Sequence, residues 1–194
     1  MDDMTTIKTR FAESLDVIKR SCDRHVDTLC SAAGLLVESY KAGGGVFLFG
    51  NGGSAADAQH IAGELVGRFL LDRRGLKAHA LTVDTSVITC LTNDYNYDMI
   101  FARQLEANAT AGDVAIGLSG SGNSPNVVAA LKYARENGMK TIAFTGDGGG
   151  ESAMYADILL DAATTVTCRA QEAHIVMYHT LCELVERSMA GMEA

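Results

Sequence analysis

Four residues in two pairs could supply acid–base chemistry in this sequence. His60 and Glu64 are four positions apart, and Gln171 and His179 are eight positions apart. A carboxylate can remove a proton from carbon, and a histidine, with a reference pKa of about 6.5, can carry a proton between oxygens near neutral pH. Helical periodicity surrounds both pairs, and turns rich in glycine and serine, of the kind that hold phosphate, accompany them. The combination favours an enzyme that acts on a sugar phosphate.

The first pair lies in the predicted helix Ala55–Phe69. At positions i and i+4 of a helix, His60 and Glu64 share one face, where they can bind one metal ion or pair with each other. Glu64 can equally pair with Arg68, four residues later. A histidine and a glutamate at this spacing are most often an ordinary surface or capping pair, so the spacing alone does not assign a role.

The second pair lies in the predicted helix Gln171–Arg187. Its members, Gln171 and His179, are separated by about two turns, roughly 12 Å along the helix axis. A lone histidine such as His179 is more often structural than catalytic. His174 points to a different face of this helix, and we place it among the structural histidines together with His25 and His79.

The first turn consists of Asn51, Gly52, Gly53 and Ser54. Glycine has no Cβ and adopts strained turn conformations freely, so the backbone here can approach a ligand closely. The turn lacks the Gly-Lys-Ser/Thr ending of a Walker loop and does not meet the GxGxxG pattern of dinucleotide-binding proteins. A ligand-binding loop and a plain tight turn are both compatible with it.

The second turn runs from Ser119 through Gly120 and Ser121 to Ser124. Three hydroxyls and free backbone donors at the start of a helix can hold a phosphate dianion without lysine or arginine. Ser124 and Pro125 fit the N-cap and N1 positions of that helix. The alternative is a flexible loop in which a single serine caps the helix.

Strands and helices alternate along the part of the chain that contains these turns. This order predicts an α/β fold with one doubly wound, largely parallel sheet flanked by helices. Because the carboxyl ends of parallel strands meet at one rim of a sheet, both turns should lie on that rim. The predicted elements are the strands Val46–Phe49, Ala78–Val83, Asp113–Leu118, Thr141–Thr145 and Ile158–Leu160, the helix Pro125–Asn137 and a turn at Gly146–Gly150.

A long helical stripe precedes the first strand. Apolar residues recur every three or four positions from Phe11 to Tyr40, ahead of a break at Gly43–Gly45. A stripe of this length exceeds what one small domain needs to cover its own core, so we expect part of it to pack against another subunit. The alternative is a pair of ordinary helices broken near Ser21.

Composition narrows the class of protein. The 194 residues include 24 acidic and 16 basic side chains, with no basic run longer than Arg73–Arg74, so a nucleic-acid partner is not expected. The five cysteines are scattered and form no CxxC motif, which favours reduced, structural thiols in a cytoplasmic protein. The N-terminus shows no signal peptide, and no apolar run approaches the ~20 residues that cross a bilayer.

Several motifs, taken together and in order, resemble those of the phosphoheptose isomerase family, whose members carry a sugar isomerase (SIS) domain. The likeness covers nearly the whole chain. It implies a single SIS domain over residues 1–194, with an N-terminal helical region at 1–42 used in oligomerisation and a flavodoxin-like α/β core, including the C-terminal helix, at 43–194. The stretches that carry it are Phe49–His60, His60–Glu64, Asn93–Tyr95, Ser119–Asn126 and Arg169–His179.

The resemblance implies that sedoheptulose 7-phosphate and D-glycero-D-manno-heptose 7-phosphate are interconverted through an enediol, the first step towards nucleotide-activated heptoses. It also implies a homotetramer with active sites near subunit interfaces, and no nucleotide or redox cofactor. The acid–base pair would be Glu64 and His179, and some members bind zinc at the positions of His60, Glu64, Gln171 and His179. Substrate contacts would come from Asn51, Gly52, Gly53, Ser54, Asp94, Ser119, Gly120, Ser121, Ser124 and Gln171.

Three expectations qualify this resemblance. The family usually has threonine where this chain has Gly120, so one hydroxyl donor to phosphate is missing and substrate affinity or identity is affected. The alternatives are an isomerase of another sugar phosphate and a binding or regulatory SIS protein of the type that associates with a replication initiator. Because Gln171 and His179 spread over about 12 Å of one helix, we also expect Glu64 and His179 to act on one substrate from different chains.

Overall fold

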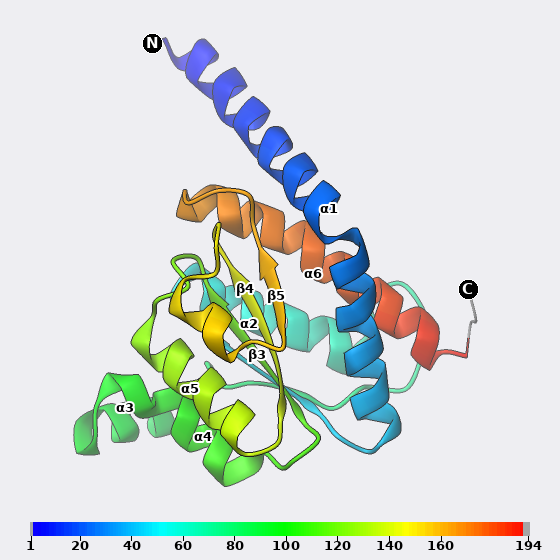
Figure 1. Cartoon of the computed structure of the whole chain (residues 1–194), viewed down its shortest axis with the longest axis vertical. Coiled ribbons are helices and arrows are strands. Elements are labelled where there is room, and N and C mark those ends of the chain that lie inside the picture. The colour runs from blue at the N-terminus through cyan, green and yellow to red at the C-terminus, as the bar shows by residue number, and fades with distance from the viewer. Residues whose placement is uncertain (1, 192–194) are drawn as a thin grey trace.

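The computed structural model describes residues 2–191 and contains a five-stranded sheet (Figure 1). All its strand pairs are parallel, in the order β2-β1-β3-β4-β5, so the doubly wound α/β prediction is confirmed. From β1 the chain moves outward to β2 and then returns to the other side of β1, and such a reversal opens a ligand-binding crevice at the carboxyl ends of β1 and β3. The strands are β1 (Val46–Gly50), β2 (Ala78–Ala80), β3 (Val114–Ser119), β4 (Lys140–Thr145) and β5 (Ile158–Asp161).

Six α-helices and two short 3-10 helices connect and cover these strands in residues 2–191. Three of the α-helices, α1, α2 and α6, pack on one face of the sheet, and α3, α4 and α5 pack on the other (Figure 1). The α-helices are α1 (Asp3–Lys41), α2 (Gly53–Val66), α3 (Thr85–Asp94), α4 (Ile100–Asn108), α5 (Pro125–Glu136) and α6 (Thr167–Met189), and the 3-10 helices are η1 (Tyr97–Met99) and η2 (Gly150–Tyr155).

Alternation along the strands divides the core into two layers. On β1, Val46 and Leu48 belong to the layer under α1, α2 and α6, whereas Phe47 and Phe49 belong to the layer under α4 and α5. Every residue of β1 and β3 is buried, as expected for strands with helices on both faces. The two strands whose ends carry the glycine and serine turns are therefore rigidly held.

The N-terminal stripe forms one helix, α1, of 39 residues. It is not broken near Ser21, where the side chain is buried and its hydroxyl accepts the N–H of Ala163 at 2.9 Å. The first part of α1 projects beyond the sheet and α6 (Figure 1) and exposes Phe11 and Leu15 by 70% and 68%. Despite its length, neither α1 nor another helix in residues 2–191 combines the length and apolar content that crossing a bilayer requires.

Two predicted boundaries move for identifiable reasons. The helix predicted to reach Phe69 ends at Val66, because the Arg73 guanidinium binds the carbonyl oxygens of Glu64, Leu65 and Gly67 at 2.8, 2.8 and 3.2 Å and completes its last turn. The strand predicted at 78–83 shortens to β2, and the chain then turns into α3, which is capped by the side chain of Asp84.

All five cysteines are free thiols. Cys182 is buried in the layer formed with α6, and burial raises the pKa of its thiol to about 12. The other four are exposed, so the expected packing role fits Cys182 alone.

Candidate active site

The two glycine and serine turns meet at the carboxyl rim of the sheet. Asn51, which follows β1, and Asn126, in the first turn of α5, exchange side-chain amide hydrogen bonds of 2.8 and 2.9 Å. Tyr97 of η1 also donates to the amide oxygen of Asn51, at 2.9 Å. The prediction that both turns share one rim is therefore confirmed, and Tyr97 is a neighbour that sequence reasoning missed.

The first turn is shaped by its glycines. Gly52 has φ of 55°, a conformation that residues with a Cβ rarely adopt. At Gly53 a Cβ would collide with the side-chain amide of Gln171, so glycine is what lets Gln171 lie against the start of α2. Ser54 is buried at the first turn of that helix.

The second turn gathers its hydroxyls. The Oγ of Ser119 lies 2.9 Å from the Oγ of Ser124 and 3.4 Å from that of Ser121. Ser124 is the N-cap of α5 with Pro125 at N1, as predicted, but its side chain makes no capping hydrogen bond and turns towards Ser119 instead. Pro125 has no N–H, and the N–H groups of Val127 and Val128 both donate to the carbonyl oxygen of Ser124 at 3.0 Å, so the N–H of Asn126 is the one at this helix start that can bind an anion.

The loop after β4 supports this second turn. Gly146 N–H and Ser152 N–H donate to the carbonyl oxygens of Gly120 and Gly122 at 3.0 and 2.8 Å. At Gly120 a Cβ would lie 3.0 Å from the methyl group of Thr167, so the side chain that the family usually carries there would crowd Thr167 at the start of α6. The predicted turn at Gly146–Gly150 therefore has a supporting role.

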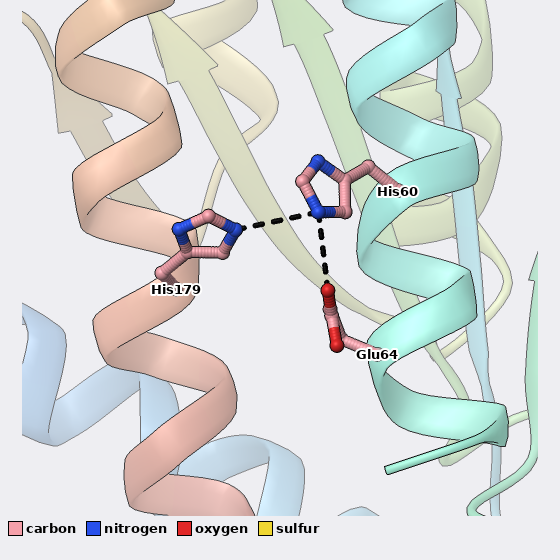
Figure 2. Close-up of side chains that lie close together, drawn as sticks. All are labelled: His60, Glu64 and His179. Carbon is pink, nitrogen blue, oxygen red and sulfur yellow. Dashed lines mark hydrogen bonds and ion pairs between the residues drawn. The ribbon is translucent and has the colours of Figure 1, made fainter. Parts of the chain in front are cut away.

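The acid–base residues come from two neighbouring helices. Helices α2 and α6 run in the same direction, since Gln171 lies against Gly53 while His179 lies beside His60 farther along both helices. Figure 2 shows His60 and Glu64 extending from α2 towards His179 on α6. The Nε2 atom of His60 is 3.1 Å from Oε1 of Glu64 and 3.4 Å from Nε2 of His179.

This geometry corrects one expectation. A single chain brings Glu64 and His179 together, with His60 between them, so the two residues need not come from different chains. Positions along α6 alone do not predict this proximity, because it arises from the packing of α2 beside α6. Glu64 pairs with His60 rather than with Arg68.

The surroundings of His179 affect its protonation. Partial burial and the neighbouring His60 lower the pKa of His179, and the charge of Glu64 opposes the shift. The ring of Phe69 stacks on His179 at a centroid distance of 5.3 Å. His179 is therefore held neutral near pH 7, with a nitrogen able to accept a proton.

Phe69 is itself held by a buried carboxylate at the other end of α6. Glu186 accepts the backbone N–H groups of residues 69, 70 and 71 at 2.8, 2.6 and 2.8 Å and lies 3.2 Å from the Nε of Arg73. Burial raises the pKa of Glu186, but these N–H groups and Arg73 outweigh it and the net pKa is lowered. Sequence reasoning missed Glu186 and Phe69, because nothing local in the sequence links them.

The remaining predicted residues lie apart from this cluster. Gln171, about 12 Å from His179 along the axis of α6, has its amide at the first turn. Asp94, the last residue of α3, contacts the side chains of Cys90 and Asn93. His174 is fully buried and bonds the carbonyl oxygen of Thr145 at 2.8 Å, as expected of a structural residue.

The cluster of His60, Glu64 and His179 has the composition and spacing of a divalent cation site. One ligand atom from each of the three lies within 4.8 Å of the others. Tetrahedral zinc with nitrogen and oxygen ligands at about 2.0–2.1 Å places those ligands roughly 3.3 Å apart. The Nε2 atom of His60 lies at close to this distance from Glu64 Oε1, 3.1 Å, and from His179 Nε2, 3.4 Å. The donor set therefore fits such an ion.

Comparison with known proteins places this site in a family. The family model for the SIS domain matches residues 10–146. The phosphoheptose isomerase of Aquifex aeolicus is 51% identical over 93% of this chain and 94% of its own length. Solved structures of phosphoheptose isomerases from Neisseria gonorrhoeae and Francisella tularensis, 40% and 31% identical, superpose with TM-scores of 0.89 and 0.93 over 94% and 96% of this chain and 98% and 100% of theirs. This chain is a member of the SIS domain family and, within it, of the phosphoheptose isomerases.

Proposed function

We propose that the protein interconverts sedoheptulose 7-phosphate and D-glycero-D-manno-heptose 7-phosphate. The observation that carries the proposal is that Glu64 and His179 lie close together in a member of the phosphoheptose isomerases. Glu64 is on α2, which begins at the first turn, and His179 is on the neighbouring helix α6. Moving a carbonyl between C1 and C2 requires a base for carbon and a proton carrier for the oxygens.

In this mechanism Glu64 takes the proton from one carbon and returns it to the other through an enediol. His179, neutral because its pKa is lowered, shuttles a proton between the two oxygens. The ring of Phe69 covers one face of His179 and limits its orientations. Both acting groups sit on helices rather than loops, which suits precise positioning.

The phosphate would bind at the second turn. The hydroxyls of Ser119, Ser121 and Ser124 and the backbone N–H of Asn126 at the start of α5 supply donors there. The sugar would extend from there towards α2 and past the first turn. Its proposed contacts at the first turn are Asn51, Gly52, Gly53 and Ser54, with Gln171 beside Gly53. At the second turn the proposed contact includes the backbone of Gly120. Asp94, at the end of α3, is a further proposed substrate contact.

We infer that the same cluster holds a divalent metal ion, with zinc the best match to its donors. His60, Glu64 and His179 would be the ligands, and Gln171 could join them only if its side chain left Gly53. When bound, the ion would polarise the substrate carbonyl and stabilise negative charge on the enediolate oxygen.

We also infer that α1 mediates assembly into a homotetramer. Its projecting part exposes Met4, Ile7, Phe11 and Leu15 by 54–70%. Apolar side chains in a row on a helix that leaves the body of its own chain are typical of a helix that packs on another copy. Light scattering of the Phe11→Ser, Leu15→Ser double variant should then show a smaller assembly than the wild type, and an unchanged mass would contradict the role of α1.

Incubation with sedoheptulose 7-phosphate in deuterated water tests the reaction. The expected result is a heptose 7-phosphate aldose that carries solvent deuterium at C2, detected by NMR and mass spectrometry. Fructose 6-phosphate and ribulose 5-phosphate serve as competing substrates, because preference for either would assign a different sugar-phosphate isomerase. Binding of the heptose phosphate without product or deuterium exchange would instead support a regulatory protein.

A further inference from the structure

A buried carboxylate that the reaction does not use lies beneath the active site. Asp57, in the second turn of α2, is 9% exposed. Its Oδ1 accepts a hydrogen bond from the hydroxyl of Tyr178 at 3.3 Å, and its Oδ2 is buried with no hydrogen-bond partner among residues 2–191. Burying a carboxylate with one oxygen unpaired costs stability, so its presence calls for a compensating role.

Tyr178 connects this carboxylate to the site. It is fully buried on α6, next to His179, and its hydroxyl lies 3.0 Å from Nδ1 of His60. The rings of Tyr178 and His60 meet edge to face, with centroids 5.4 Å apart. The three side chains form a continuous line from Asp57 through Tyr178 to the inner nitrogen of His60, while the outer nitrogen of His60 faces Glu64 and His179.

The direction of these hydrogen bonds follows from what each group can donate. Burial raises the pKa of the Asp57 carboxyl, and the hydrogen bond from Tyr178 and the nearby His60 oppose that shift. Above this pKa the carboxylate only accepts, so the Tyr178 hydroxyl gives its proton to Asp57. The Tyr178 oxygen can then only accept from His60, which requires hydrogen on Nδ1. A neutral His60 in this state has its lone pair on Nε2, directed into the cluster.

A competing arrangement exists and is weaker. Glu64 alone would favour hydrogen on Nε2 of His60, 3.1 Å away. Glu64 is partly open to solvent, its side chain being 21% exposed, so water can satisfy it when His60 does not. Asp57 is buried and would lose its remaining hydrogen bond, and an unsatisfied buried group is costlier when it is charged. The buried partner should therefore decide the tautomer.

We propose that Asp57 and Tyr178 are positioning residues that hold His60 as its Nδ1–H tautomer and present the Nε2 lone pair to Glu64 and His179. This inference rests on the proposed function, because it concerns the same site. It explains why a carboxylate is kept where an apolar side chain would stabilise the fold. A lone pair held in this direction is what a cation or a transferred proton at the cluster requires.

The test is the tautomer of His60 in metal-free protein, measured without substrate. The chain has only five histidines, so long-range 1H–15N correlation spectra of 15N-histidine-labelled protein in EDTA at pH 8 can resolve them, and a His60→Gln sample assigns the signal. The expected wild-type result is the Nδ1–H tautomer. Predominant Nε2–H in the wild type would overturn the proposal, whatever the activity assay shows.

Two variants sharpen the result. Asp57→Leu removes the acceptor while keeping the number of side-chain heavy atoms, and Tyr178→Phe removes the bridge, so in both the His60 signal should move towards Nε2–H. Asp57→Leu should melt at or above the wild-type temperature, which a purely structural role for Asp57 would not predict. Tyr133→Phe, on the opposite face of the sheet, is the matched control and should leave the His60 signal unchanged.

Zinc affinity provides a second readout. Loss of a group that orients a metal ligand typically weakens metal binding or activity 10–100-fold, so chelator competition should show about that change for Tyr178→Phe and none for Tyr133→Phe. Folded Asp57→Leu and Tyr178→Phe proteins that both keep the Nδ1–H tautomer would refute the positioning role, even if activity had fallen.

Discussion

Two histidine–carboxylate pairs in this molecule have almost the same geometry and opposite surroundings. His25 Nε2 lies 3.0 Å from Asp161 Oδ1, and His60 Nε2 lies 3.1 Å from Glu64 Oε1. The side chains of the first pair are 6% and 10% exposed, and those of the second are 44% and 21% exposed. Residue type and distance therefore do not separate a structural pair from a reactive one.

Hydrogen-bond partners make the difference. Around Asp161, Arg24 binds Oδ2 at 2.5 Å, Gly148 N–H donates to the same oxygen at 3.1 Å, and His25 also reaches the Asp161 carbonyl oxygen at 2.8 Å. This pair joins α1 to the end of β5 and has no accessible lone pair to offer. In the other pair three acceptor atoms from His60, Glu64 and His179 converge at an accessible place. Breaking the first pair should cost stability, and breaking the second should cost turnover.

The largest expected effect comes from Glu64→Gln. This change keeps the shape and removes the base, so kcat should fall by about 10²–10⁴-fold while KM changes little. Steady-state kinetics with sedoheptulose 7-phosphate measure it, and Glu136→Gln on the exposed side of α5 is the matched control. Turnover of Glu64→Gln within a few-fold of the wild type would remove Glu64 from the mechanism.

The buried histidine of α6 extends the comparison to pH. Burial lowers the pKa of His174 to about 4, against a reference of about 6.5 in the unfolded chain. Below that reference the unfolded state binds a proton that the native state does not, so stability should decrease as pH falls from about 6.5 towards 4. The full shift corresponds to about 3 kcal/mol.

Urea unfolding across this pH range measures the effect. The His174→Gln variant, which can still donate to the Thr145 carbonyl, should show a shallower decline than the wild type. Parallel curves for the two proteins would mean that other groups cause the acid sensitivity.

The structural pair predicts a loss of stability without loss of chemistry. Asp161→Ala leaves His25 and Arg24 without their carboxylate, so the free energy of unfolding should fall by about 1–3 kcal/mol. Asp23→Ala, which removes an exposed carboxylate paired with Lys19 on the same helix, should change it by less than about 1 kcal/mol. Activity per folded Asp161→Ala molecule that drops as far as in Glu64→Gln would erase the distinction between the two pairs.

Local patterns predicted the parts of the molecule that depend on local rules. Helical and strand periodicity gave the element order, and the parallel-sheet rule placed the two turns on one rim, as the Asn51–Asn126 contact confirms. The predicted carboxyl boundary of α2 was wrong because Arg73, seven residues beyond its end, caps it. The contacts that α6 makes with α2 and with the segment after α2, such as those of Tyr178 and Phe69, depend on how these elements are aligned, which no spacing within either helix reveals.

The smallest expected effect concerns the ring that covers His179. Phe69→Leu keeps an apolar side chain on the segment held by Glu186 but removes the stacked face at 5.3 Å. Aromatic pairs contribute about 0.5–1.5 kcal/mol beyond area burial, which corresponds to a roughly two- to tenfold lower kcat if the stack orients His179. Because the backbone N–H bonds to Glu186 do not involve this side chain, the melting temperature should change little. Leu70→Ala, next along the same segment with an exposed side chain, is the control and should retain full turnover. Equal losses in both variants would show that the segment as a whole matters rather than the Phe69 ring.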